Sequence, residues 1–166
     1  SAPANDVESA VYDAAKADFK KAEDKYLATD GAKAKYDEAK PAYDTAKNKY
    51  DAAKATHDAA ELVWQAAEQA WAKAQQDFKE GTIDEDAKQA ALNAYSAARN
   101  VWQKAEDTFK TEKAAWGSAE ANFKPILEAY QAAEKEYEAA QKALAKAKAE
   151  KKWVFIDCYT SWCGPC

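Results

Sequence analysis

Aromatic side chains recur at every seventh residue along most of this chain, and this spacing constrains its fold more than any other feature. One series contains Tyr36, Tyr43, Tyr50, His57, Trp64, Trp71 and Phe78, and a second contains Tyr95, Trp102, Phe109, Trp116, Phe123, Tyr130, Tyr137 and Leu144. Three residues after almost every member stands an alanine; Glu112 and Ile126 are exceptions. An aromatic residue at the a position and alanine at the d position of each heptad predict long helices that pack as a coiled coil.

The composition agrees with long helices and excludes several classes of protein. Alanine provides 43 of the 166 residues, whereas Val, Ile and Leu together number only 13, too few for a β-sandwich or a doubly wound sheet over most of the chain. The net charge of −5 is spread along the chain and lacks the basic stripe of a nucleic-acid-binding protein. No apolar run approaches the ~20 residues that a membrane-spanning helix needs.

The heptad phase breaks at two places, and each break marks the end of a helix. The first break falls at residues 29–31, and the second falls at Gly81, which suits the positive φ of a helix C′ position. Thr82 and Glu85 fit a capping box that starts the next helix. The predicted helices span residues 6–28, 32–79 and 83–150.

A tight turn at Gly81 would fold the second and third helices into an antiparallel hairpin. The facing residue numbers then sum to 162, which places rings opposite alanines, as for Trp64 with Ala98 and Ala60 with Trp102. Alternating large and small side chains fill the space between two close helices. We expect the first helix to pack at the open end of this hairpin as a third helix, in a register that the sequence leaves open.

The predicted fold class is therefore all-α, an elongated antiparallel helical hairpin or coiled coil with a short third helix. Pro41 and Pro125 lie within unbroken heptads, so we expect each to kink its helix without ending it. Glu112 occupies a d position that faces Tyr50, and a hydrogen bond between the carboxylate and the hydroxyl would explain it.

Most of the conspicuous side chains are explained by packing. Rings at heptad spacing opposite alanine are predicted core residues, although such a series could also stack on sugars or bases. We interpret His57, the only histidine, as a partly buried core residue, because no second metal-ligand pattern accompanies it. The sequence contains no Ser-His-Asp set, Gly-rich phosphate loop or zinc-ligand spacing, and it predicts no cofactor and no metal.

The chain changes character after Lys151-Lys152. The stretch Trp153-Val154-Phe155-Ile156-Asp157-Cys158-Tyr159 is the only β-type apolar run, and Trp162-Cys163-Gly164-Pro165-Cys166 follows it closely. A strand pattern followed by this pentapeptide resembles the active-site segment of the thioredoxin superfamily. The resemblance covers residues 141–166, which we interpret as the start of a thioredoxin-like domain. Residues 1–140 then form the alanine-rich helical bundle or coiled coil.

The resemblance implies thiol–disulfide exchange and assigns a role to each residue of the motif. Cys163 would be the nucleophile, and Cys166 would resolve the mixed disulfide. Asp157 would help to move the proton of Cys166, Trp162 would shield the site, and Pro165 would set its local geometry and redox potential. The family assigns no role to Cys158. The 166 residues depart from the family because they do not include the remaining elements of a thioredoxin fold, so we expect this chain alone to lack the activity.

Three interpretations of the chain stay open at this point. It is the front part of a longer exported oxidoreductase, or a coiled-coil spacer whose end only resembles a redox site, or a thioredoxin-like segment joined to a helical scaffold. The preferred function is a structural or interaction-mediating helical module whose partners are proteins. The start Ser1-Ala2-Pro3-Ala4 is typical of a mature exported protein, in the periplasm or at the cell surface, although removal of a tag leaves a similar end.

Overall fold

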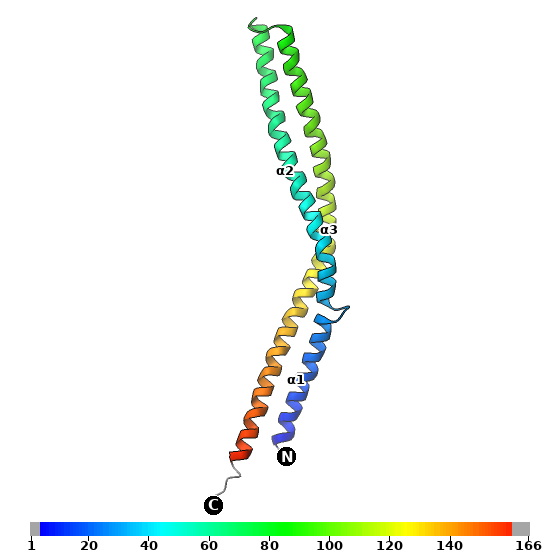
Figure 1. The fold of residues 1–166 in the computed structure, drawn as a ribbon, viewed down its shortest axis with the longest axis vertical. Helices are drawn as coiled ribbons and strands as arrows, with labels where there is room; N and C mark the ends of the chain where they lie inside the picture. The colour runs from blue at the N-terminus through cyan, green and yellow to red at the C-terminus, as the bar shows by residue number, and fades with distance from the viewer. Residues whose placement is uncertain (1–3, 161–166) are drawn as a thin grey trace, which may run out of the picture. The chain divides into compact units, whose positions relative to one another are not determined.

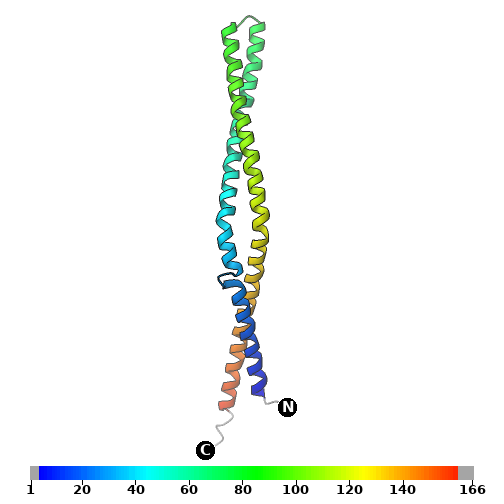
Figure 2. The same cartoon turned by 90° about the vertical axis from the view of Figure 1, so that its right-hand side faces the viewer.

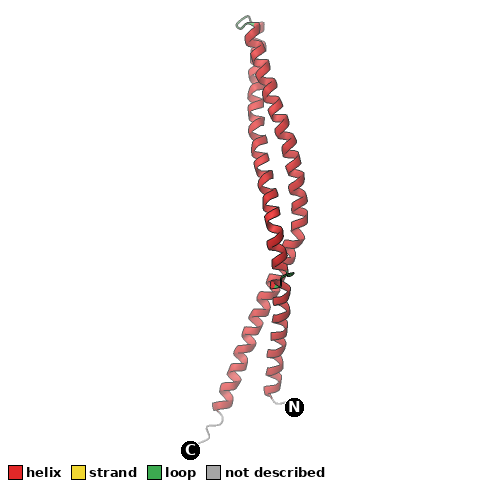
Figure 3. Ribbon diagram, turned by 45° about the vertical axis from the view of Figure 1, so that its right-hand side comes forward, coloured by secondary structure: helices red, strands yellow, loops and turns green. Residues whose placement is uncertain are grey.

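The computed structural model describes the backbone of residues 4–160 and the side chains of residues 9–150. Three helices follow one another along this part of the chain: α1 (Ala4–Leu27), α2 (Ala32–Lys79) and α3 (Glu85–Thr160) (Figures 1 and 3). The predicted all-α class is confirmed, since residues 4–160 contain no strand. The helices form two compact units, residues 1–40 with 123–166 and residues 41–122.

The turn between α2 and α3 closes with a Schellman motif around Gly81. The N–H of Thr82 donates to the carbonyl of Asp77 at 2.9 Å, and the N–H of Gly81 donates to the carbonyl of Phe78 at 3.1 Å. These two bonds satisfy carbonyls that the end of α2 leaves without helical partners. Gly81 has a φ of 75°, as the sequence predicted. Lys88, in the first turns of α3, places its Nζ 4.0 Å from the ring centre of Phe78 and adds a cation–π contact to the turn.

The start of α3 differs from the predicted capping box. The residue at the N-cap is Asp84, whose Oδ1 accepts a hydrogen bond of 2.8 Å from the N–H of Ala87. The predicted N-cap, Thr82, instead belongs to the end of α2, where its Oγ1 also donates to the carbonyl of Asp77 at 2.9 Å. The capping-box prediction was therefore wrong, because the Schellman motif requires Thr82 at its C″ position.

In the second unit, residues 41–122, α2 and α3 lie side by side (Figures 1 and 2), and their register agrees with the sequence prediction. The ring of Tyr50 lies between those of Phe109 and Trp116, at centroid distances of 5.7 and 4.7 Å. The ring of His57 lies between those of Trp102 and Phe109, at 6.3 and 5.2 Å. Tyr50 and His57 thus each face the d residue midway between two α3 rings, which is the pairing whose numbers sum to 162.

Small side chains form the most buried layer between the helices of this unit. The buried positions are Ala53, Ala60, Ala74, Ala98 and Ala105, all at d positions. The rings around them are only half-buried, because two helices cannot enclose a large side chain on every side. Three indole N–H groups nevertheless lie out of reach of solvent without a hydrogen-bond acceptor, those of Trp64, Trp102 and Trp116.

In the first unit, residues 1–40 with 123–166, α1 packs on α3 in line with the start of α2 rather than beside it. The ring of Tyr26 lies 5.7 and 5.3 Å from those of Tyr130 and Tyr137, and the ring of Tyr36 lies 5.5 and 4.4 Å from those of Phe123 and Tyr130. The expected three-helix arrangement is therefore not formed in this unit. Tyr26 and Tyr36 are ten residues apart in sequence, but the positions that they contact on α3 differ by only one heptad of seven residues.

The turn between α1 and α2 absorbs the three surplus residues. The N–H of Gly31 donates to the carbonyl of Ala28 at 2.8 Å. A Cβ at Gly31 would lie 2.9 Å from the carbonyl oxygens of Ala28 and Tyr26, which are backbone atoms and cannot move aside cheaply. Glycine is therefore required at position 31, because the backbone of the turn passes too close for a side chain. The turn allows both helices to keep their rings directed at α3.

Two further expectations concern single elements. Pro41 and Pro125 both lie inside helices, so neither ends its helix, as predicted. The strand predicted over residues 153–159 is not seen, since α3 has a helical backbone to Thr160. Residues 4–160 contain no second strand to pair with it, whereas a helix satisfies its own backbone groups. Residues 161–166 lie outside the described residues, so the thioredoxin-like assignment stays a prediction.

Candidate functional site

Titratable side chains converge from both helices around His57, midway along the second unit. His57 holds the a position of its heptad, and its side chain is 14% exposed. Its ring is stacked on Phe109, with centroids 5.2 Å apart and planes 24° from parallel. The prediction of a partly buried core histidine is confirmed. Because the e position of the antiparallel helix flanks an a residue, the imidazole also reaches Glu106 of α3.

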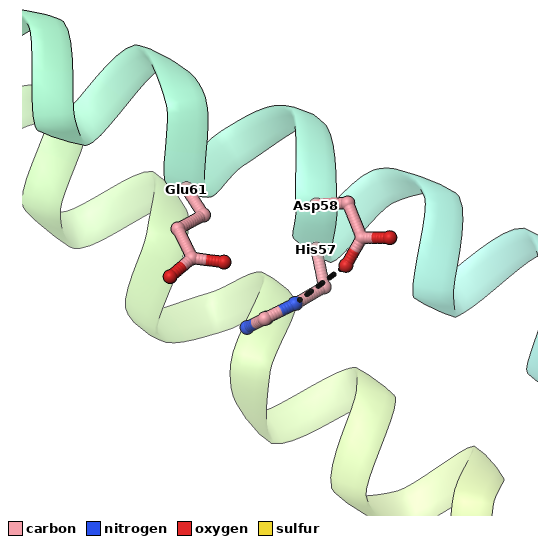
Figure 4. Close-up of side chains that lie close together, drawn as sticks. All are labelled: His57, Asp58 and Glu61. Atoms are coloured by element: carbon pink, nitrogen blue, oxygen red, sulfur yellow. Dashed lines mark hydrogen bonds and ion pairs between the residues drawn. The ribbon is translucent and has the colours of Figure 1, made fainter.

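Both ring nitrogens of His57 have carboxylate partners. Nε2 lies 2.7 Å from Glu106 Oε2. Nδ1 lies 3.3 Å from Asp58 Oδ1, the contact that is dashed in Figure 4. Two lysines complete the arrangement, with Lys54 Nζ 2.5 Å from Asp58 Oδ2 and Lys110 Nζ 2.9 Å from Glu106 Oε1. We call these five residues the His57 cluster. It joins α2 to α3 through a polar contact beside an otherwise apolar interface.

The lysines set the charge state of the two carboxylates. A hydrogen bond from Lys54, followed by one from His57, lowers the pKa of Asp58 below its ordinary value. A hydrogen bond from Lys110 lowers the pKa of Glu106, and His57 adds to the effect. The same pairs raise the pKa values of Lys54 and Lys110. The two carboxylates and the two lysines of the cluster are therefore ionised at neutral pH.

Two residues of the cluster, His57 and Asp58, form a set with the neighbouring Glu61 that has the residue types of a metal site. Single ligand atoms of His57, Asp58 and Glu61 all lie within 4.8 Å of one another, and Figure 4 shows Glu61 one turn along α2 from the histidine. The spacing of His57 and Glu61, four residues apart on one helix face, is the signal in the sequence that could have indicated this set. Lys54 already pairs with Asp58, and Glu106 already lies against Nε2 of His57, so the contacts fit an interhelical polar clasp better than a metal site.

A second polar network lies in the first unit, where α1 meets α3. The hydroxyl of Tyr26 lies 3.3 Å from that of Tyr130 and donates to Glu134 Oε1 at 3.1 Å, while Tyr130 donates to the same oxygen at 2.9 Å. The hydrogen bonds with Tyr26 and Glu134 raise the pKa of Tyr130 far above its ordinary value. An ion pair of 2.6 Å between Lys25 and Glu136 lies on the same pair of helices. This network fixes the register of α1, which the sequence alone leaves open.

A shallow groove of about 430 Å³ lies on the second unit where Glu112 interrupts the alanine series. Its lining residues are Pro41, Ala42, Thr45, Ala46, Lys49, Glu112 and Ala115. Glu112 is half-buried and faces the level of Tyr50, as predicted, but the hydrogen bond expected between the two is not formed. The polar side chains of the lining are Thr45, Lys49 and Glu112, and the Thr45 hydroxyl already donates to the carbonyl of Pro41 at 2.8 Å, so the groove does not resemble a small-molecule site.

The residues predicted for thiol–disulfide exchange cannot be brought into this geometry. Trp162, Cys163, Pro165 and Cys166 lie outside the described residues, and the side chain of Asp157 lies outside those described within α3. Their predicted roles, as nucleophile, resolving cysteine, proton carrier and supporting residues, stay predictions. The described side chains therefore provide two interhelical polar networks and one groove.

No helix within the described residues combines the length and the apolar character needed to cross a membrane. Comparison of the chain with protein-family models, with curated proteins and with solved structures found no match.

Proposed function

We propose that the helical part of this chain, residues 1–150, is a structural or interaction-mediating module. The observation that carries the proposal is the continuous interlocking of rings and alanines between α2 and α3. It uses the aromatic rings for helix pairing and leaves the remaining helix faces exposed along their length. Residues 41–79 of α2 span about 58 Å at ~1.5 Å per residue, which suits a spacer or a docking surface.

The polar networks support this proposal because they act between helices. The Nε2–Oε2 contact of His57 with Glu106 and the contacts of Tyr26 with Tyr130 and Glu134 each fix one register. Polar contacts inside a helix pair specify alignment more than they add stability. A module that holds two ends or two partners at a set separation needs such specification.

The second candidate is the N-terminal part of a thiol–disulfide oxidoreductase, and the pentapeptide Trp162-Cys163-Gly164-Pro165-Cys166 favours it. Cys163 would attack a disulfide of the substrate protein and form a mixed disulfide, releasing one substrate thiol. Cys166 would then displace the second substrate thiol and leave the two cysteines oxidised to a disulfide. An exported location, in the periplasm or at the cell surface, fits this candidate, because oxidising compartments maintain such chemistry.

Reduction of insulin by dithiothreitol, followed by turbidity, separates the two candidates. We expect the 166-residue chain to leave the rate at that of dithiothreitol alone, and Cys163→Ser to behave identically. Both proteins should also keep the same helix content and unfolding temperature by circular dichroism. An acceleration by the chain that Cys163→Ser abolishes would instead assign this protein an oxidoreductase activity and reject the purely structural role.

A further inference from the structure

The middle of one side of the second unit carries almost no charge. The residues immediately before each ring, and those two after it, lie on the same side of the helix pair in α2 and α3. Near the middle of the unit these residues are Thr56, Ala59, Val63, Ala66 and Ala70 in α2, and Ala94, Ala97, Val101, Lys104 and Thr108 in α3. All ten are exposed, and Lys104 is the only charged residue among them. We call this surface the neutral face.

The opposite side of the same helices is densely charged. Over the same stretch it carries Lys54, Asp58, Glu61 and Glu68 from α2, and Arg99, Glu106 and Lys110 from α3. It also includes the His57 cluster. On the other side, Val63 and Val101 leave 60% and 59% of their surfaces exposed.

The placement of Val63 and Val101 on one side is supported by the first unit. There, the equivalent heptad positions are held by Lys25 and Glu136, which form an ion pair of 2.6 Å between α1 and α3. In the first unit this pair of heptad positions is therefore occupied by an ion pair between its own two helices. In the second unit the same positions carry valines and small residues, which gain by contact with another apolar surface.

The charges at the two ends of the neutral face identify a second copy of this chain as the occupant. Lys49 and Asp77 occupy the same heptad position as Val63, each 14 residues away from it, one on either side. Suppose that a two-fold axis places Val63 on Val63 of a second copy, with the α2 helices antiparallel. Lys49 of each copy then lies opposite Asp77 of the other copy. Asp77 already pairs with Lys73 at 2.7 Å, so Lys49 would join an existing ion pair.

The size of the face suits a dimer. Residues 49–77 cover about 42 Å, and two helices side by side are about 20 Å wide, so the footprint is about 800 Å² on each copy. That is the area a standard protein interface buries on one partner. We infer that the neutral face of the second unit binds the same face of a second copy, with the α2 helices antiparallel, to form a four-helix bundle.

This inference rests on the proposed function, because it names the partner of an interaction module. Sedimentation velocity of the full chain, under reducing conditions and over a range of concentrations, tests it with two matched variants. Val63→Lys with Val101→Lys adds two positive charges to the neutral face. Gln65→Lys with Gln103→Lys adds the same charge to exposed positions on the opposite side. We expect the parent and the Gln variant to dimerise, and the Val variant to dimerise at least tenfold more weakly.

The alignment is tested by disulfide formation in a chain whose three cysteines are replaced by serine. Val63→Cys should form a covalent dimer on oxidation, and Gln65→Cys should not. Circular dichroism of every variant checks that the helices are retained. A parent that stays monomeric, or a dimer that the Val variant does not weaken, overturns the inference, as does failure of Val63→Cys to crosslink. If the chain is monomeric and does not accelerate insulin reduction, only self-association is rejected. If the chain accelerates insulin reduction in a way that depends on Cys163, the proposed function itself is rejected.

Discussion

The indole rings of Trp64 and Trp102 stack with their centroids 4.5 Å apart and their planes 23° from parallel, although the two residues belong to opposite helices. Stacking of this kind contributes about 0.5–1.5 kcal/mol beyond the burial of apolar area. Both indole N–H groups are shielded from solvent and have no acceptor, which costs about 1–3 kcal/mol for each group. The rings therefore stabilise the hairpin by packing, while their nitrogen atoms oppose it.

Trp102→Phe tests this balance. The substitution keeps an aromatic ring against Ala60 and removes the donor that lacks a partner, so we expect the free energy of unfolding to change by less than about 1 kcal/mol. Trp102→Ala should cost about 3 kcal/mol, because it removes the ring altogether. Urea unfolding followed by circular dichroism measures both. Equal losses in the two variants would show that the indole nitrogen is satisfied in solution.

The cap of α3 provides a second prediction that distinguishes the structure from the sequence pattern. Asp84→Ala removes the acceptor for the N–H of Ala87 and should lower the free energy of unfolding by about 1 kcal/mol. Thr82→Ala removes an exposed hydroxyl and its hydrogen bond to the carbonyl of Asp77, but that carbonyl keeps its bond from the backbone N–H of residue 82, so the substitution should cost less than half as much. Thermal unfolding of the two variants gives the ranking, and the reverse order would restore the capping box predicted at Thr82.

The turn at Gly81 gives a third prediction. A side chain there would meet no other atom within 4 Å, so any effect of Gly81→Ala comes from the φ of 75° alone. We expect a loss of about 1 kcal/mol in the free energy of unfolding, because alanine is strained in the left-handed region. Gly117→Ala is the matched control, since Gly117 has open space around it and lies inside α3 without a positive φ. It should leave the chain as stable or more stable.

The register of α2 against α3 was predictable because the heptads supply many pairings with a single centre. One turn residue, Gly81, and one repeat length fix the level of each ring. The contact of His57 with Glu106 follows from the same register once the a and e positions are recognised as neighbours. The position of α1 was not predictable, because it depends on how many residues the turn at Gly31 absorbs. That number is set by the close approach of Gly31 to the carbonyls of Tyr26 and Ala28.

The N-terminus of α3 shows why local patterns can mislead. Thr82 with Glu85 and Asp84 with Ala87 both have cap-to-N3 spacing, and propensity does not separate them. The Schellman motif decides, since it uses the backbone of Thr82 to end α2. For residues 153–166 the sequence still carries more information than the described structure. The strand and the redox site both depend on partners that residues 4–160 do not supply.

The His57 cluster predicts how stability depends on pH. Lys110, and then His57, lower the pKa of Glu106 below its ordinary value of 4.5, so the folded state binds a proton at this carboxylate less readily than the unfolded state. The resulting stabilisation is complete above pH ~4.5 and is lost as pH falls through the folded pKa. Glu106→Gln should therefore reduce the fall in unfolding temperature between pH 6 and pH 3, measured by circular dichroism. Glu68→Gln removes an exposed carboxylate that forms no ion pair with a described residue, and it should keep the fall of the parent. Identical profiles for the parent and Glu106→Gln would show that the clasp does not contribute.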